Sequence, residues 1–152
     1  MKLPATSIDI QASLPEVFAF VTDWQNLERI FPHISDVKPL TPPTGTIPQH
    51  FRQTRHLHGQ QWQETLSVIA LETNKAYTLR ILIFGIETYY TYHFSACAGG
   101  STHLDLEREY HGKYLYKLLY PLVRHVLTKP EHDGNHLNTL KQAIEQQEQA
   151  AP

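Results

Sequence analysis

The fold is decided by the C-terminal stretch at residues 112–147, GKYLYKLLYPLVRHVLTKPEHDGNHLNTLKQAIEQQ. Its apolar residues recur at spacings of three and four, the period of one face of a helix. This apolar stripe consists of Leu115, Leu118, Leu119, Leu122, Val123, Val126, Leu137, Leu140 and Ile144. A stripe of this length needs an apolar surface to lie on, so a long helix packed on a sheet is expected. Pro121 and Pro130 lie inside it and predict a kinked or twice-started helix.

The N-terminal part of the chain predicts one strand followed by two short helices. Residues 5–11 alternate between apolar and polar, which is typical of a strand. Ser13 is suited to cap a helix that has Pro15 in its first turn. Asp23 can cap a second short helix, which Pro32 ends. These helices are expected to support one end of the sheet.

The middle of the chain, from about 37 to 111, consists almost wholly of predicted strands. The strand at 33–40 is followed by a loop at 41–48, which is rich in proline and glycine. Turns are predicted at 59–60, 72–75, 85–86 and 98–100. With these turns, the residues expected to lie opposite one another are Arg55 and Glu64, Ala70 and Tyr77, Ile81 and Tyr90, Leu79 and Tyr92, and Tyr77 and Phe94.

Opposed residues must share a face, because side chains alternate along a strand. The predicted pairs carry one face through all the strands of the middle region. We expect this face to be concave and to lie under the C-terminal helix. Its members are Phe51, Gln53, Arg55, Leu57, Trp62, Glu64, Leu66, Val68, Ala70, Tyr77, Leu79, Ile81, Tyr90, Tyr92, Phe94, Leu104, Leu106, Arg108 and Tyr110.

Three segments resemble a known superfamily: IDIQASLPEVFAFVTDWQNLERIFPHISDV at 8–37, the GGST turn at 99–102 and LNTLKQAIE at 137–145. They are similar to the birch pollen allergen, START lipid-transfer and polyketide cyclase/dehydrase superfamily (SRPBCC). The resemblance covers the whole chain, 1–152, as a single domain. It implies an α+β helix-grip fold: a seven-stranded curved antiparallel sheet wrapped around a long C-terminal helix, with two short helices after the first strand.

The resemblance also implies a cavity between the sheet and the long helix. An empty cavity of about 300 Å³ would cost about 7 kcal/mol, so such a space is expected to be filled by water or a ligand. The predicted function is the binding or transport of a hydrophobic small molecule, such as a lipid, a quinone or a polyketide-like compound. Apolar walls with sparse polar groups are usual for such sites. The predicted ligand-binding residues are Phe51, Gln53, Arg55, Trp62, Glu64, Leu66, Val68, Leu79, Ile81, Tyr90, Tyr92, Phe94, Leu106, Arg108, Leu119, Leu122 and Val126.

The charged residues on this face allow two interpretations. Arg55 and Glu64 form a cross-strand ion pair in the first, which requires no ligand. In the second, Arg55, Glu64 and Arg108 act with Tyr90 or Tyr92 as catalytic groups of a cyclase or dehydratase, polarising a ketone and moving a proton. Both interpretations remain open at this point.

No metal or cofactor is predicted. His132 and His136 are one helical turn apart, a spacing that can hold zinc, but the segment is polar and lacks a third ligand of clear register. A solvated helix start is the favoured interpretation for these histidines. A nucleophile turn of the type GxSxG is also absent from the sequence.

Composition limits the partners and the compartment. The chain has 152 residues and a formal net charge of −2, with a pI near 6.5, which predicts neither nucleic-acid binding nor attraction to an acidic membrane. Cys97 is the single cysteine, so a reducing compartment is expected. Without an apolar signal segment or an apolar window of transmembrane length, we predict a soluble, cytoplasmic protein with no stable membrane insertion.

Overall fold

The computed structural model describes residues 1–42, 45–57, 59–83, 85–112, 118, 121 and 136–150. Within them, seven antiparallel strands form one sheet in the order β1-β7-β6-β5-β4-β3-β2. The strands are β1 (Thr6–Ile10), β2 (Ile34–Pro39), β3 (Gln49–Leu57), β4 (Gln60–Glu72), β5 (Ala76–Ile83), β6 (Ile86–Ala96) and β7 (Thr102–Gly112). The helices are α1 (Leu14–Thr22), the 3-10 helix η1 (Trp24–Asn26), α2 (Leu27–Ile30) and α5 (His136–Ala150).

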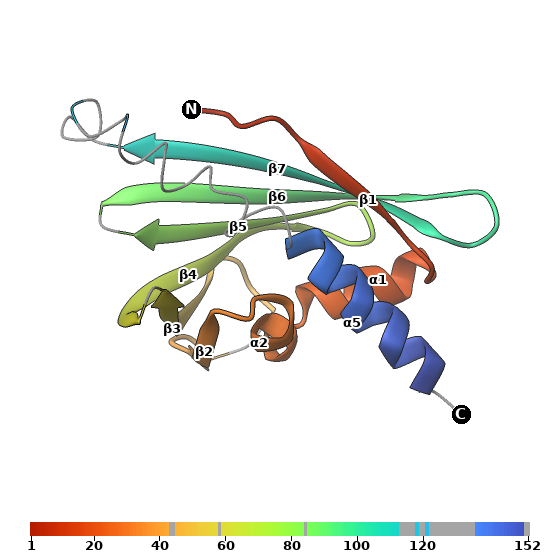
Figure 1. Ribbon diagram of the computed structural model, residues 1–152, viewed down its shortest axis with the longest axis horizontal. Coiled ribbons are helices and arrows are strands. Elements are labelled where there is room, and N and C mark those ends of the chain that lie inside the picture. Colours follow the sequence, from red (N-terminus) through yellow and green to blue (C-terminus); the bar gives the residue numbers. More distant parts are fainter. Residues whose placement is uncertain are drawn as a thin grey trace.

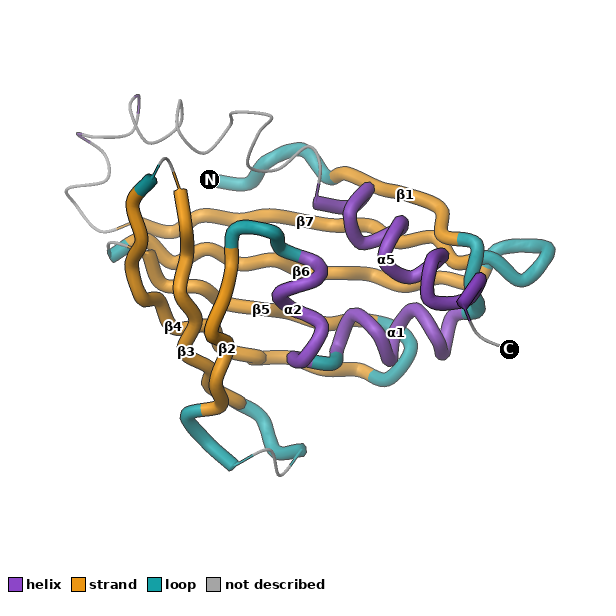
Figure 2. The backbone as a smooth tube through the Cα atoms, turned by 60° about the horizontal axis from the view of Figure 1, so that its bottom comes forward, coloured by secondary structure: helices purple, strands orange, loops and turns teal. Residues whose placement is uncertain are grey.

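The sheet bends strongly, and the helices lie on its concave side (Figure 1). In Figure 2, β2, β3 and β4 run nearly across the direction of β5, β6, β7 and β1, so that the sheet curls around α1, α2 and α5. Helix α5 contacts β1, α1 and α2. The predicted seven-stranded curved sheet, with two short helices after the first strand and a helix at the C-terminus, is confirmed.

The N-terminal helices begin where their capping residues predict. The Ser13 backbone N–H donates to Glu16 Oε2 at 3.2 Å, at the start of α1. Asp23 Oδ1 accepts a hydrogen bond from the Gln25 backbone N–H at 3.0 Å, and the chain turns there into η1. Side-chain acceptors of this kind satisfy backbone donors that have no partner inside the helix.

Two of the predicted turns are shifted by one residue. Gly59 and Gly85 adopt positive φ angles of 75° and 79°, and each is the second residue of a two-residue turn rather than the first. Leu57 therefore pairs with Gln60, and Ile83 pairs with Ile86. Each hairpin register moves by two residues as a result. The corrected pairs are Gln53 with Glu64, Arg55 with Trp62, Ile81 with Thr88, Leu79 with Tyr90, and Tyr77 with Tyr92.

The pairing of β4 with β5 differs from the prediction because β4 contains a β-bulge. Val68 pairs with Leu79 as predicted, but the register then shifts, and Ala70 pairs with Thr78 instead of Tyr77. The extra residue in β4 turns the end of the strand, so that Ala70 is exposed. A second irregularity lies in β2, where the register against β3 shifts between Ser35 and Lys38 and Asp36 has a φ of 52°.

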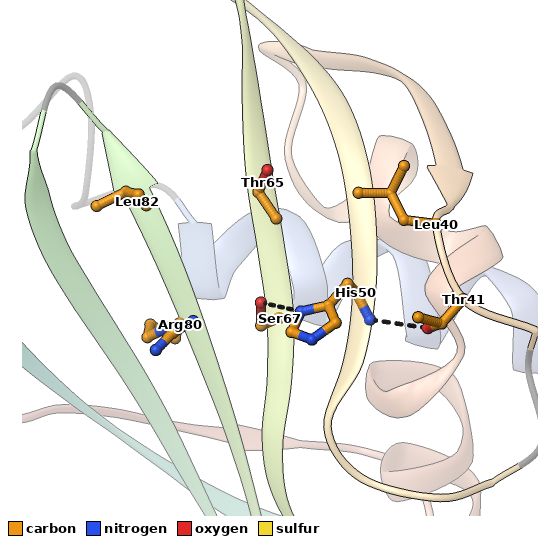
Figure 3. Close-up of a pocket in the computed structure, with 7 residues that line it drawn as sticks. All are labelled: Leu40, Thr41, His50, Thr65, Ser67, Arg80 and Leu82. Atoms are coloured by element: carbon orange, nitrogen blue, oxygen red, sulfur yellow. Dashed lines mark hydrogen bonds between the residues drawn. The ribbon is translucent and has the colours of Figure 1, made fainter.

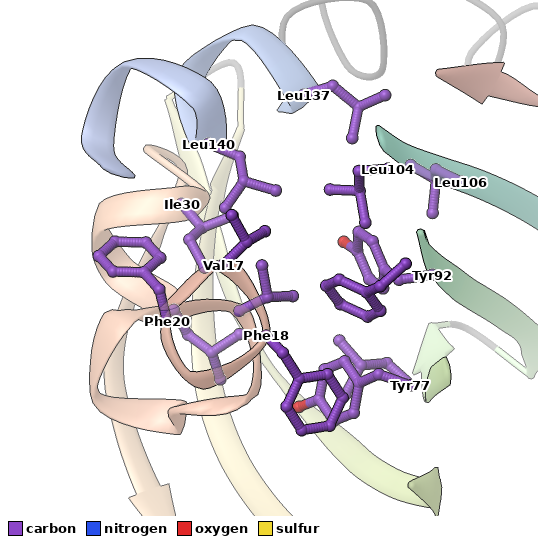
Figure 4. Packing of buried hydrophobic residues seen from close by; sticks show 14 of the residues in the cluster. Val17, Phe18, Phe20, Ile30, Tyr77, Tyr92, Leu104, Leu106, Leu137 and Leu140 are labelled. Carbon is purple, nitrogen blue, oxygen red and sulfur yellow. The ribbon is translucent and has the colours of Figure 1, made fainter. Parts of the chain in front are cut away.

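The predicted face survives these corrections, because a shift of two residues leaves every side chain on the same side of the sheet. Ala70 is the exception. In Figure 4, Val17, Leu137 and Leu140 from the helices point toward Tyr92 and Leu104 of the sheet. The core cluster includes Phe51, Leu66, Val68, Tyr77, Leu79, Ile81, Tyr92, Phe94, Leu104 and Leu106 from the strands.

The C-terminal helix is confirmed over its second half. In α5, Leu137, Leu140 and Ile144 are buried against the core as the stripe predicts. Leu118, which also belongs to the predicted stripe, is 80% exposed, so its assignment to a buried face is wrong. The other stripe residues, together with Pro130, lie outside the described residues.

The replacement Leu140→Ala is expected to lower the free energy of unfolding by about 2–5 kcal/mol, because Leu140 is fully buried and its loss leaves a cavity. Urea unfolding monitored by circular dichroism measures this change. As a control, Leu71→Ala at an exposed leucine of β4 is expected to change stability by less than about 0.5 kcal/mol. Equal effects of the two replacements would contradict the packing of α5 on the sheet.

Candidate ligand-binding site

The strand residues predicted to bind ligand share the concave face. In the observed register they form rows across the sheet, such as Arg108, Tyr90, Leu79 and Val68, or Tyr92 with Leu106. Phe51, Leu66, Ile81 and Phe94 are buried on this face, while Tyr90 is half-buried. Leu119, Leu122 and Val126, the predicted ligand-binding residues of the long helix, lie outside the described residues.

A hydrogen-bonded cluster surrounds Glu64, whose side chain is 1% exposed. Its carboxylate accepts hydrogen bonds from Gln53 Nε2 at 2.6 Å, Arg55 Nη2 at 2.6 Å and Trp62 Nε1 at 3.2 Å. Arg55 Nε adds donations at 2.9 and 3.0 Å to the two oxygens. We call Gln53, Arg55, Trp62 and Glu64 the Glu64 cluster.

The Glu64 cluster realises the first of the two interpretations of the charged residues. Arg55 and Glu64 form a direct ion pair, although they lie diagonally across the hairpin rather than opposite each other. Donors from three side chains already surround the carboxylate, so a substrate proton would have to displace one of them. The arrangement orients groups at the wall more readily than it moves protons.

Arg108 belongs to a different part of the face. It lies on β7 opposite Tyr90, and strands β6 and β5 separate it from Glu64 on β4. Its guanidinium charge acts on His136 at the start of α5. The three residues predicted as a catalytic group are therefore divided into the Arg55–Glu64 pair and Arg108.

His136 is buried between the sheet and the segment after α2. Its Nε2 is hydrogen-bonded to the Tyr92 hydroxyl at 2.6 Å, and its ring stacks on Phe31 with 4.3 Å between centroids. Burial, with a smaller contribution from the positive charge of Arg108, lowers the pKa of His136 to about 3. The imidazole is therefore neutral at physiological pH.

The prediction of a solvated helix start is wrong for His136, and His132 lies outside the described residues. The signal that would have found it is its position one helical turn before Leu140 and two turns before Ile144, in phase with the buried stripe. A polar residue in phase with a buried stripe is expected to face the core, where it needs hydrogen-bond partners.

Gln53 Oε1 and His136 Nδ1 are two of the buried polar atoms on this wall, and both keep hydrogen-bonding capacity. Among the described residues, none is hydrogen-bonded to Gln53 Oε1 or to His136 Nδ1. Leaving such an atom unsatisfied costs roughly 1–3 kcal/mol. Buried polar atoms are nearly always satisfied, so a bound molecule or water is the usual partner at such places.

Within the described parts of the chain, no group of three or more His, Cys, Asp or Glu side chains is placed to hold a metal ion. Among the helices that the structure describes, none is long and apolar enough to cross a membrane.

Residues 5–145 match the model of a family described as polyketide cyclase/dehydrase and lipid transport. The match extends from β1 to the middle of α5 and so includes both the Glu64 cluster and His136. None of the curated proteins matches the chain.

Solved structures share the fold at low sequence identity. The Zhui aromatase/cyclase from Streptomyces sp. R1128 is 14% identical with a TM-score of 0.75, over 99% of this chain and 96% of that one. A norcoclaurine synthase mutant from Thalictrum flavum is 12% identical with a TM-score of 0.70, over 97% of both chains. Ara h 8.0201 is 10% identical with a TM-score of 0.69, over 96% of this chain and 98% of that one. These likenesses confirm the predicted helix-grip fold and leave the chemistry open. The predicted superfamily is confirmed by the family match over residues 5–145.

Proposed function

Because the chain belongs to the polyketide cyclase/dehydrase and lipid transport family, we propose that its concave face binds a hydrophobic small molecule such as a lipid, a quinone or a polyketide-like aromatic compound. The observation that carries the proposal is the presence of two buried polar atoms, Gln53 Oε1 and His136 Nδ1, on a wall formed mainly by apolar side chains. A ligand with a hydroxyl or an amide N–H satisfies Gln53 Oε1 by donating to it. At His136 Nδ1 the ligand donates or accepts according to the tautomer.

The apolar wall supplies most of the binding free energy. Leu66, Leu79, Ile81 and Leu106 are each 1% exposed and lie on the same face of strands β4, β5 and β7. A ligand that buries about 200 Å² of apolar surface gains about 5 kcal/mol from leaving water. The polar groups then set its orientation, which is the division of roles seen in most small-molecule sites.

Turnover by Arg55, Glu64 and Arg108 stays a prediction. The carboxylate of Glu64 accepts hydrogen bonds from Gln53, Arg55 and Trp62, so a substrate proton would have to displace one of these donors. This favours binding or transport over cyclase or dehydratase chemistry as the function of the face. We also propose that the protein works in the cytoplasm, as its single cysteine predicts.

The direct experiment is native mass spectrometry of the purified protein, followed by organic extraction and a screen of lipids, quinones and aromatic compounds. We expect a bound species of a few hundred daltons, or saturable binding of at least one apolar compound, in the micromolar range. Absence of both would refute the proposal.

The replacement Tyr90→Ala is expected to weaken binding of the uncharged apolar probe N-phenyl-1-naphthylamine about tenfold, since an aromatic wall residue contributes roughly 1.5–3 kcal/mol when it is fully covered. Tyr90 is half-buried on the concave face. The matched control is Tyr89→Ala, which removes the same side chain from the opposite face of the same strand and should leave binding unchanged. Fluorescence titration measures both. Equal weakening by the two replacements would place the probe elsewhere.

A further inference from the structure

A pocket lies on the convex face of the sheet, on the side opposite the helices. His50, Ser67 and Arg80 are paired in one row across β3, β4 and β5, and Thr65 and Leu82 are paired in the neighbouring row. These residues, with Leu40 and Thr41 at the end of β2, line a cavity of about 390 Å³ (Figure 3). We call it the outer pocket. Its volume lies in the lower part of the range of small-molecule sites, about 300–1000 Å³.

The floor of the outer pocket is polar. His50 Nδ1 is hydrogen-bonded to Ser67 Oγ at 2.7 Å, and the backbone N–H of His50 donates to Thr41 Oγ1 at 3.2 Å. Ser67 is only 2% exposed although it points away from the core of the protein. Figure 3 shows the His50 ring beside Ser67, with Thr65 and Arg80 on the neighbouring parts of the strands. Hydroxyl and imidazole groups of this kind can donate to an oxyanion.

Arg80 is the permanently charged side chain among the residues that line the outer pocket. Arg80 Nη1 lies 3.7 Å from Glu87 Oε1, too far for a hydrogen bond, and Glu87 also accepts from the Tyr89 hydroxyl at 3.1 Å. Arg80 therefore forms an ion pair with Glu87 and also a side-chain hydrogen bond with Tyr89. A guanidinium has five N–H donors, so these contacts use only part of them. In the strand register, Arg52 of β3 lies opposite Thr65 of β4, and Lys38 of β2 lies opposite Arg52. These two cations lie in the row beside that of Arg80, in contrast to the net charge of −2 of the whole chain.

The rim of the outer pocket is apolar. Leu40 is 46% exposed and Leu82 is 49% exposed, on opposite sides of the polar floor. We propose that the outer pocket binds a small organic anion, a carboxylate or phosphate monoester that carries a short apolar group. The anionic end contacts Arg80 and the floor around His50 and Ser67, and the apolar end covers Leu40 and Leu82. Arg80 forms charge-assisted hydrogen bonds to the anion, which are the strongest contacts available there.

The experiment is an NMR titration of the isotope-labelled protein with phenyl phosphate, hexanoate and inorganic phosphate. We expect saturable shifts of the Thr65, Ser67 and Leu82 amides, with a dissociation constant of about 1 mM or below for phenyl phosphate or hexanoate. Inorganic phosphate is expected to bind more weakly, because it makes no contact with the leucines. Amides of the concave face, such as those of Tyr92 and Leu106, should stay unshifted.

The replacement Arg80→Gln is expected to weaken binding about tenfold or more, since it removes the charge that holds the anion. Lys75→Gln is the matched control: Lys75 is an exposed cation that also pairs with a glutamate, Glu72, and it lies at the turn after β4. This control should leave binding unchanged. The proposal is overturned if no probe saturates, if both replacements weaken binding equally, or if inorganic phosphate binds as tightly as phenyl phosphate. Shifts confined to Tyr92 and Leu106 would also overturn it while supporting a ligand on the concave face.

Discussion

Replacement of Glu64 by alanine is expected to lower the free energy of unfolding by about 3–5 kcal/mol. The carboxylate is 1% exposed and compensates the charge of Arg55, which is 19% exposed. Without it, a partly buried guanidinium and the donors of Gln53 and Trp62 lose their acceptor. Ordinary domains have a total stability of about 5–15 kcal/mol, so a loss of this size endangers folding.

Urea unfolding of Glu64→Ala and of the isosteric Glu64→Gln measures the effect. Glu64→Gln keeps an acceptor oxygen but removes the charge, so it should lie between the wild type and the alanine variant. The matched control is Glu72→Ala, which breaks the exposed pair with Lys75 and should have a much smaller effect. A loss below about 1 kcal/mol for Glu64→Ala would show that the ion pair is not a support of the concave face.

Acidification is expected to destabilise the protein through His136. The pKa of His136 is lowered from its usual value of 6.5 to about 3 in the folded protein. At a pH between these two values, the imidazole of His136 is protonated in the unfolded chain and neutral in the folded protein. The contribution of the neutral, buried His136 to the free energy of unfolding is therefore fully present above about pH 6.5. It is lost by about 1.4 kcal/mol per pH unit as the pH falls toward about 3.

The test compares urea unfolding of the wild type and His136→Gln at several pH values from about 7 to about 5. Other titrating groups are common to both proteins, so the difference in slope isolates His136, which is surrounded by Tyr92, Phe31 and the charge of Arg108. We expect a shallower slope for the variant, whatever its stability at neutral pH. Equal slopes for the wild type and His136→Gln would contradict the burial of a neutral imidazole.

The faces of the strands could be predicted from the sequence because side chains alternate with a period of two. The observed registers of the β3–β4 and β5–β6 hairpins, whose turns contain Gly59 and Gly85, differ from the predicted ones by two residues. Leu66, Ile81 and Tyr92 nevertheless lie on one face, as predicted. The bulge after Val68 could not be predicted, since an ordinary apolar strand sequence carries no mark of an extra residue.

The candidate site was less accessible to sequence reasoning. The predicted ion pair of Arg55 with Glu64 holds in spite of its wrong register, because long side chains reach a diagonal neighbour. The convergence of Gln53 and Trp62 on the same carboxylate follows from the corrected register. His136 was missed because the polar residues around it suggested solvent. Its phase with Leu140 would have indicated the core.

The irregular β2 strand bears on how molecules of this protein meet one another. An open sheet exposes unpaired backbone groups at its outermost strand, where a neighbouring chain can add and start intermolecular aggregation. Here the kink at Asp36, followed by Lys38 and Pro39, interrupts the straight row of donors and acceptors that such an addition requires. Straightening this segment is therefore expected to favour pairing of β2 with a neighbouring molecule.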